Sequence, residues 1–320
     1  ITLPGLLLER VRRSPDAIAY IQFDPITERW VETRWREVSA EIGRWQAALR
    51  REKLVPGDRV AVQMANRREW VVFDIAALGL GLVTVPLYTN DRPENVRHIL
   101  SDAGARLLLI ESSERLAALA PIADTLGGLE RVLVLEPGAD APTGEISASQ
   151  VSDWLAGAEG AAEDAVGKAE SLATIVYTSG TTGPPKGVML SHRNMLWNAE
   201  ASLTCIQAYP TDRFLSFLPL SHALERTGGY YLPMMAGSSV AYARSIPQLA
   251  EDLAAIRPTV LIAVPRIFER VHARIQDKLG HEPAAARRLF EAAVGVVAGE
   301  GPAPVDLDAS PDDDLPVGLQ

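Results

Sequence analysis

The sequence predicts an α/β fold in which two packed subdomains contain mostly parallel β-sheets. Short apolar runs alternate with longer helical patterns along the first 136 residues. A glycine- and hydroxyl-rich loop directly follows the apolar run 173–177, and the alternation then resumes. Strands that are joined by helical crossovers favour a doubly wound parallel sheet, which binds ligands beyond the carboxyl ends of its strands.

The first subdomain is expected to span residues 1–170. Short β-branched runs predict its strands, and longer apolar or amphipathic runs predict its helices, one of which begins at Pro93. The expected strands are 59–64, 83–87, 106–110 and 131–135, and the expected helices are 68–80, 93–103 and 114–126. Residues 137–170 are rich in Gly, Ala, Ser, Asp and Glu, and therefore resemble an acidic connection that Trp154 anchors.

A second α/β segment is expected over residues 171–299. After the strand 173–177, the same periodicities predict helices at 194–206, 248–257 and 267–279, and strands at 213–218, 239–243 and 260–264. Residues 228–235 are expected to pack as an apolar segment. The tail 300–320 is rich in proline and aspartate, which predicts disorder.

The composition is typical of a large enzyme of a reducing compartment. With 320 residues, of which 47% are hydrophobic, the chain is long enough to bury a sizeable core. The single cysteine, Cys205, excludes an internal disulfide framework and a cysteine-rich zinc site, and we expect it in a helix core. The most apolar stretch, 71–88, contains Asp74 and several helix breakers, so we expect no membrane span, and the N-terminus lacks a secretion signal. These observations predict a cytoplasmic protein.

The net charge of −10 is concentrated in two segments. Residues 136–170 contain eight acidic side chains and one lysine, and residues 300–320 contain six acidic side chains and no basic one, so the remaining body has a charge of +3. A mildly basic body suits anionic ligands, and the acidic segments resemble solvated surface. No basic stripe indicates nucleic-acid binding.

The loop after residue 177 predicts a phosphate site. Glycine permits positive φ angles and close backbone approach, so that N–H groups converge on an anion while hydroxyls donate to other oxygens. A lysine after the loop adds a positive charge. The candidate phosphate ligands are Thr178, Ser179, Gly180, Thr181, Thr182, Gly183 and Lys186.

Alternative interpretations of these motifs are weaker. Pro184 and Pro185 oppose a helix directly after the loop, whereas a Walker A loop opens a helix with Gly-Lys-Ser/Thr. A solvated turn is the ordinary explanation of such composition, but the preceding strand and the following lysine argue against it. Residues 79–81 lack the third glycine of a dinucleotide fingerprint, and His281-Glu282 lacks the second histidine of a zinc helix.

At this point the chain resembles the adenylate-forming enzymes, a superfamily of acyl-CoA synthetases, peptide-synthetase adenylation domains and luciferases. Residues 178–188 are similar to its signature loop, and 217–226 to the block that places a histidine beside the acyl carboxylate. Residues 258–271, together with Glu225-Arg226, resemble the long-chain fatty acyl-CoA synthetase branch. The resemblance covers roughly residues 1–280 and implies the N-terminal region of the adenylate-forming fold.

The resemblance also implies the chemistry. A long-chain fatty acid would be activated by ATP to an acyl-adenylate, which coenzyme A then captures. The phosphate loop would hold the β- and γ-phosphates, Thr178 would also reach Mg²⁺, and His222 would act at the acyl carboxylate. On the residues alone, a core histidine that is bonded to backbone is the favoured interpretation of His222, and the resemblance shifts the preference to the site. Arg266 is open between the nucleotide cleft and a surface or capping role, and Glu225 and Arg226 are expected to pair with each other structurally.

The family's later motifs are missing from this sequence. Adenine contacts, a glutamate for Mg²⁺, an aspartate for the ribose and a lysine on a C-terminal lid domain do not occur before Gln320. We therefore interpret the chain as the N-terminal part of an acyl-CoA synthetase without its lid domain. Two alternatives stay open: an acyl-AMP ligase that feeds a carrier protein, and a non-catalytic nucleotide- or acyl-binding module. Peripheral membrane contact is compatible with a long-chain substrate.

Overall fold

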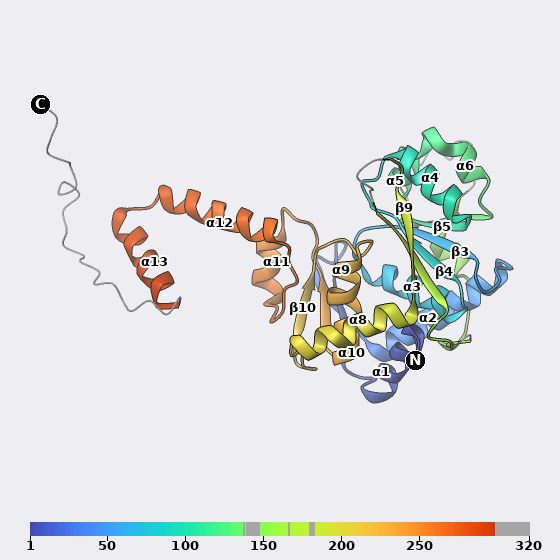
Figure 1. Cartoon of the computed structure of the whole chain (residues 1–320), viewed down its shortest axis with the longest axis horizontal. Helices are drawn as coiled ribbons and strands as arrows, with labels where there is room; N and C mark the ends of the chain where they lie inside the picture. The colour runs from blue at the N-terminus through green and yellow to red at the C-terminus, as the bar shows by residue number, and fades with distance from the viewer. Residues whose placement is uncertain (137, 139–147, 166, 179–182, 298–320) are drawn as a thin grey trace, which may run out of the picture. The chain divides into compact units, whose positions relative to one another are not determined.

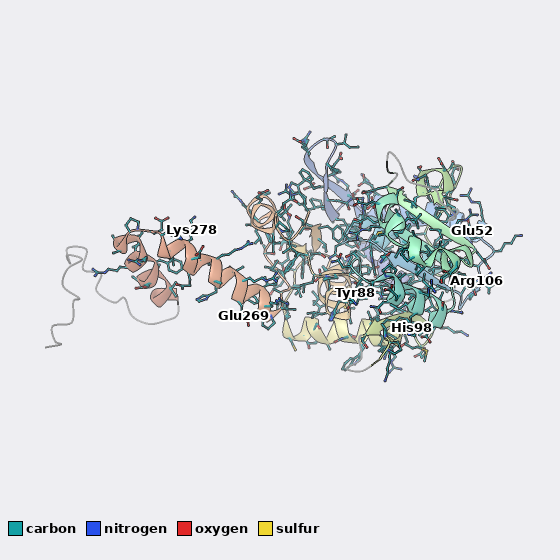
Figure 2. All side chains as sticks on the ribbon, turned by 90° about the horizontal axis from the view of Figure 1, so that it is seen from above. Glu52, Tyr88, His98, Arg106, Glu269 and Lys278 are labelled. Atoms are coloured by element: carbon teal, nitrogen blue, oxygen red, sulfur yellow. The ribbon has the colours of Figure 1, made fainter. Side chains whose placement is uncertain are left out.

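The computed structural model describes residues 1–136, 138, 148–165, 167–178 and 183–297. The chain divides into two units, Ile1–Ile262 and Ala263–Gln320, and each is described by itself. In the second unit, α12 (Pro265–Gly280) contacts α13 (Ala284–Val297). Figure 2 shows Glu269 and Lys278 along α12. None of the helices formed by the described residues is long and apolar enough to cross a membrane.

The first unit contains strands in two sheets and the helices that cover them. Its strands are β1 (Ile18–Asp24), β2 (Arg29–Arg34), β3 (Arg59–Gln63), β4 (Val83–Pro86), β5 (Ala105–Ser112), β6 (Arg131–Glu136), β7 (Ser149–Gln150), β8 (Leu172–Thr178), β9 (Lys186–Ser191), β10 (Arg213–Ser216) and β11 (Ser239–Tyr242). Its helices are α1 (Leu3–Arg13), α2 (Trp35–Arg51), α3 (Arg68–Gly79), α4 (Pro93–Ala103), α5 (Ser113–Ala118), η1 (Ala120–Ile122), α6 (Ala123–Gly127), α7 (Val151–Trp154), α8 (His192–Cys205), α9 (Ala223–Glu225), the π-helix η2 (Arg226–Tyr231), α10 (Leu232–Ala236) and α11 (Leu249–Ile256).

The larger sheet has the strand order β7-β6-β5-β3-β4-β8-β9, and all its pairs are parallel except β8 with β9. Successive side chains alternate between its two faces. Ala61 and Leu108 belong to a core under α4, η1 and α6, whereas Val60 and Leu107 belong to the core that includes α2 and α3. Figure 1 shows α4, α5 and α6 grouped together beside this sheet.

The smaller sheet has the order β10-β11-β1-β2, in which β10 with β11 and β11 with β1 are parallel pairs and β1 with β2 is antiparallel. Tyr20 and Phe214 on one of its faces join the same core as α2 and α3, so helices lie between the two sheets. Ile21 and Leu215 on the other face pack with Ile256 of α11. This layering confirms the predicted α/β fold with two packed, mostly parallel sheets.

Strand pairing does not follow the division that we predicted at residue 170. β8 and β9 lie after that boundary, but they continue the sheet that β3 to β7 form. β1 and β2, from the start of the chain, pair instead with the late strands β10 and β11. Hydrogen bonding between distant strands determines sheet membership, and chain order does not specify it.

Several predicted elements differ locally from the structure. The helix expected at 114–126 is divided into α5, η1 and α6, and Pro121, which lacks a backbone N–H, lies at the interruption. The strand expected at 260–264 forms only one bridge, between Val260 and Phe214. Cys205 is exposed at the end of α8 rather than buried in a helix core.

Other expectations are confirmed. Trp154 anchors the acidic connection, because its side chain is buried and its Nε1 donates to Glu52 Oε1 at 2.7 Å. Arg51, the last residue of α2, donates to the carbonyl groups of Trp154 and Ala156. Much of the segment expected to pack at 228–235 is buried within η2 and α10. The expected tail 300–320 lies outside the described residues.

A fully buried ion pair lies in the helical layer between the sheets. Arg226 Nη2 donates to Asp74 Oδ1 at 2.7 Å, and both side chains are 0% exposed. Arg226 Nη1 also donates to Thr174 Oγ1 of β8 at 2.8 Å, and the guanidinium lies 5.1 Å from the Trp70 ring centroid. Burial is the largest single influence on the pKa of Arg226 and lowers it, but the charge and hydrogen bond of Asp74 together with Tyr231 and Tyr230 outweigh burial and raise that pKa.

Replacing Asp74 with asparagine is expected to lower the free energy of unfolding by about 3–5 kcal/mol, because the guanidinium of Arg226 would stay buried without a counter-charge. Urea denaturation followed by tryptophan fluorescence measures this change. Glu9→Gln, which breaks exposed pairs with Arg12 and Arg13, is the control and is expected to change stability far less. Equal losses of unfolding free energy in the two variants would contradict the stabilising role of the Asp74–Arg226 pair.

Candidate functional site

The predicted phosphate loop is the connection of a β-hairpin. Thr178, the last residue of β8, pairs with Lys186, the first residue of β9, and both side chains are exposed. Gly183 has a φ of 113°, a left-handed conformation that favours glycine, and nothing lies within 4 Å of the position that a Cβ would take. Ser179, Gly180, Thr181 and Thr182 lie outside the described residues.

The chain after the loop forms a strand before it forms a helix. Pro184 and Pro185 precede β9, and α8 begins only at His192, where Ser191 caps it. The Ser191 hydroxyl accepts from the N–H of Asn194 at 3.2 Å, and Asn194 Oδ1 accepts from the N–H of Ser191. The expectation that this loop is not of the Walker A type is therefore confirmed.

Helix α4 holds the base of this hairpin, a feature that the sequence reasoning missed. Tyr177 Oη donates to Asp102 Oδ2 at 2.6 Å, and His98 Nε2 donates to the carbonyl oxygen of Pro185 at 2.9 Å. The rings of His98 and Tyr177 also meet edge to face. His98 is labelled in Figure 2. Burial, followed by the hydrogen bond and charge of Asp102, raises the pKa of Tyr177. Both ends of the loop are thus fixed to one helix.

His222 lies at the start of α9, directly after an irregular segment that leaves β10. Its side chain is exposed, and its Nδ1 accepts from the N–H of Leu224 at 3.2 Å. A neutral imidazole that accepts at Nδ1 has its proton on Nε2, so His222 presents an N–H donor. Such a donor suits a carboxylate. The alternative of a core histidine does not fit, because the residue is exposed.

The segment around His222 is held by side chains from elsewhere in the fold. Asn66, which follows β3, donates to Ser216 Oγ and to the Leu218 carbonyl, and it accepts from the N–H of Leu220. Ser216 Oγ in turn donates to the buried carboxylate of Glu225 at 2.6 Å. Ser216 ends β10 as Asn66 follows β3, so the carboxyl ends of strands from both sheets meet here.

The expected pairing between Glu225 and Arg226 is wrong. Glu225 bonds to Ser216, whereas Arg226 bonds to Asp74 and Thr174. Adjacent residues on a helix point in different directions, so each side chain found its own partner. Through Thr174, the same arginine connects the end of the His222 segment to the strand that leads into the phosphate loop.

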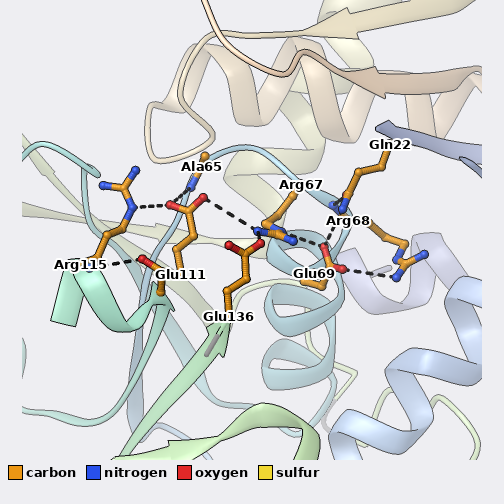
Figure 3. Close-up of polar contacts among 9 residues, drawn as sticks. Gln22, Ala65, Arg67, Arg68, Glu69, Glu111, Arg115 and Glu136 are labelled. Carbon is orange, nitrogen blue, oxygen red and sulfur yellow. Dashed lines mark hydrogen bonds and ion pairs between the residues drawn. The ribbon is translucent and has the colours of Figure 1, made fainter. Parts of the chain in front are cut away.

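A cavity of about 700 Å³ lies where β3, β5, β6 and β11 end. Its lining includes an ion-pair network, drawn in Figure 3, in which Arg67 contacts Glu136 at 2.6 Å, Glu69 at 3.0 Å and Glu111 at 3.9 Å. Glu111 also bonds to Arg115. The sequence reasoning did not identify this cavity. The charges in Figure 3 are paired with one another, so this part of the cavity lining is a network of ion pairs.

The remaining candidate residues contribute less to the site. Arg266, in the first turn of α12, is exposed. Among the residues that the structure describes, no group of three or more His, Cys, Asp or Glu side chains is arranged to bind a metal ion. The predicted role of Thr178 as a metal ligand stays a prediction.

Comparisons with known proteins place this geometry in context. The model of the family described as AMP-binding enzyme matches residues 7–311. The long-chain-fatty-acid CoA ligase FadD15 of Mycobacterium tuberculosis is 31% identical over 295 residues, which cover 89% of this chain and 47% of that protein. The peroxisomal long chain acyl-CoA synthetase 7 of Arabidopsis thaliana is 32% identical over 247 residues, covering 74% and 35%. The chain therefore spans less than half the length of these curated relatives.

A solved structure agrees with this likeness. The Mycobacterium tuberculosis fatty acyl CoA synthetase superposes with a TM-score of 0.66 at 26% identity, and the match covers 84% of this chain and 50% of that chain.

The carboxyl group of Glu225 provides a pH test. Burial raises its pKa to about 7 from an ordinary 4.5, and the Ser216 hydrogen bond only partly opposes this shift. The pKa of Glu225 is higher in the folded chain than in the unfolded chain. Its protonation therefore contributes fully to the free energy of unfolding below pH 4.5, and this contribution is lost as the pH rises through 7.

We expect the free energy of unfolding of the native chain, relative to Glu225→Gln, to fall by roughly 3 kcal/mol between pH 4.5 and 7.5. Glutamine imitates the protonated carboxyl at every pH, so the variant lacks this slope. Urea unfolding at several pH values measures the free energy of unfolding of both proteins. Parallel pH profiles would contradict the raised pKa of Glu225.

Proposed function

Because the chain belongs to the family of AMP-binding enzymes, we propose that it acts in the ATP-dependent activation of a long-chain fatty acid, first to an acyl-adenylate and then to acyl-CoA. The long-chain assignment is supported by the two curated relatives, which are named as enzymes of that class. The pairing of Thr178 with Lys186 across the hairpin is the observation that carries the proposal, because it puts a hydroxyl and a cation at the two ends of one glycine-containing loop.

In the first step, a carboxylate oxygen of the fatty acid attacks the α-phosphorus of ATP, and the bond to pyrophosphate breaks. Protein groups contribute mainly by positioning and by stabilising charge. The loop 178–183 and Lys186 would hold the β- and γ-phosphates of the leaving pyrophosphate. The clamp of His98 and Asp102 would keep the ends of the loop in place during this step.

In the second step, the thiol sulfur of coenzyme A attacks the acyl carbon, and AMP leaves. The Nε2–H of His222 would donate to a carboxylate oxygen of the fatty acid before activation and to the acyl oxygen afterwards. This role uses the tautomer that the bond from the Leu224 N–H favours.

Mg²⁺ commonly neutralises nucleotide phosphates by binding oxygen ligands. The described residues offer it the Thr178 hydroxyl and no carboxylate cluster, so they do not form a complete site for the ion.

The test is fatty-acid-dependent exchange of labelled pyrophosphate into ATP. We expect Lys186→Ala and Thr182→Ala to lower the exchange rate by about 10²-fold, because each removes a group that stabilises phosphate charge. Lys168→Ala removes another exposed lysine and is the matched control, which we expect to retain the native rate.

Adding coenzyme A separates the proposal from its alternatives. Acyl-CoA formation supports the ligase. Exchange without thioester formation indicates an acyl-AMP ligase that serves a carrier protein, and ATP binding without exchange indicates a non-catalytic module. Unchanged kinetics in both variants would refute the phosphate role of the loop.

A further inference from the structure

The exposed His222 lies on a segment that has little secondary structure of its own. This His222 segment (residues 216–225) leaves β10 and reaches α9 through an irregular stretch between Ser216 and Ala223. A turn bond from the His222 N–H to the Pro219 carbonyl, at 2.9 Å, fixes its local shape. That bond does not determine where the segment lies relative to the larger sheet.

Asn66 supplies that missing constraint through one planar amide. Its Nδ2 donates to the Leu218 carbonyl at 2.5 Å and to Ser216 Oγ at 2.9 Å, and its Oδ1 accepts from the Leu220 N–H at 2.8 Å. The amide therefore uses two donors and one acceptor on three residues of the same segment. Both the nitrogen and the oxygen of the amide form hydrogen bonds, so the side chain cannot rotate without losing several of them.

The bonds of Asn66 also continue into the interior. The Ser216 hydroxyl accepts a hydrogen bond from Asn66 and donates one to Glu225 Oε1 at 2.6 Å, so the hydrogen bonds run in one direction. Asn66 thus holds the first half of the segment, and the bond between Ser216 and Glu225 joins its two ends, with His222 between them. Asn66 itself follows β3, the strand between β4 and β5 in the larger sheet.

We propose that Asn66 is a positioning residue, which holds the His222 segment so that the imidazole meets the acyl carboxylate. The proposal rests on the proposed function, because it assumes that the substrate carboxylate lies at His222. Asn66 acts through backbone and Ser216 contacts and does not itself need to touch the substrate. Small displacements of a reacting group can cost a factor of 10² in rate.

The first test compares Asn66→Asp with the native chain in pyrophosphate exchange. Aspartate keeps the acceptor for the Leu220 N–H but loses both donors, and it faces the Leu218 carbonyl with a negative charge. We expect kcat to fall by about 10- to 100-fold while KM for ATP stays within about threefold, because the phosphate loop is held by α4 and not by Asn66.

The matched control is Gln63→Glu at the end of the same strand. Gln63 Nε2 donates to the Tyr88 carbonyl at 3.0 Å, and the side chain is 3% exposed. This variant makes the same amide-to-carboxylate change in a side chain that donates to a backbone carbonyl outside the His222 segment. We expect it to reduce thermal stability at least as much as Asn66→Asp does, with kcat close to native. An equal fall of kcat in both variants would overturn the proposal.

The second test does not depend on activity. Amide hydrogen exchange of peptides from 217–224 is expected to accelerate by about tenfold or more in Asn66→Ala, which removes the acceptor of the Leu220 N–H, and to stay native in Gln63→Glu. Native exchange in Asn66→Ala would overturn the positioning role. If the native chain shows no pyrophosphate exchange, the proposed function fails for this chain, and the hydrogen-exchange result alone decides whether Asn66 positions the segment.

Discussion

The buried ion pair between Asp74 and Arg226 joins parts of the chain that lie 152 residues apart, and the helical layer between the sheets depends on it. Removing two charges from water is costly unless hydrogen bonds satisfy them. Here Thr174, Tyr230 and Tyr231 supply bonds to the two charged groups. These bonds exist only when α3, β8 and η2 are in register together. The pair therefore favours one arrangement of the layer over others with equal apolar burial.

The ion pair connects the two predicted parts of the site, the glycine-containing loop after β8 and the His222 segment. Thr174 lies four residues before the end of β8, where the glycine-containing loop begins, and Arg226 directly follows the His222 segment. Asn66 adds a contact between the carboxyl ends of β3 and β10. Parallel strands gather their carboxyl ends at one edge of a sheet, and here one edge of each sheet is joined to the other. The two ends of the glycine-containing loop are attached to α4 by the bonds of Asp102 and His98.

Much of the fold could be predicted from the sequence because local patterns specify it. Period-two and helical periodicities located β3, α3, β4 and α4 to within about two residues. The prolines after the loop correctly predicted that no helix follows the loop directly, but the strand β9 that follows it was not predicted. Failures arose where a local pattern was interrupted or overridden. Pro121 divided a predicted helix, and residues 260–264, although apolar, formed only one bridge with the edge strand β10.

The candidate site shows the same limit. The signature loop and His222 are recognisable as residue patterns, but Asn66, His98 and Asp102 act through contacts that no spacing reveals. One signal was available: an aspartate inside the otherwise apolar helix α3 indicates a buried polar partner, since an unpaired charge there would be prohibitively costly. The identity of that partner was not available from the sequence.

The sequence by itself determined the α/β class, the position of most elements and the lack of a helix directly after the glycine-containing loop, because these depend on side-chain periodicity and on the backbone constraints of glycine and proline. Only the tertiary structure decided which strands share a sheet, that Arg226 pairs with Asp74 and not with Glu225, and that Asn66 holds the His222 segment. These choices depend on distances between residues far apart in the chain. Such distances are set by the packing of whole layers, which local sequence does not encode.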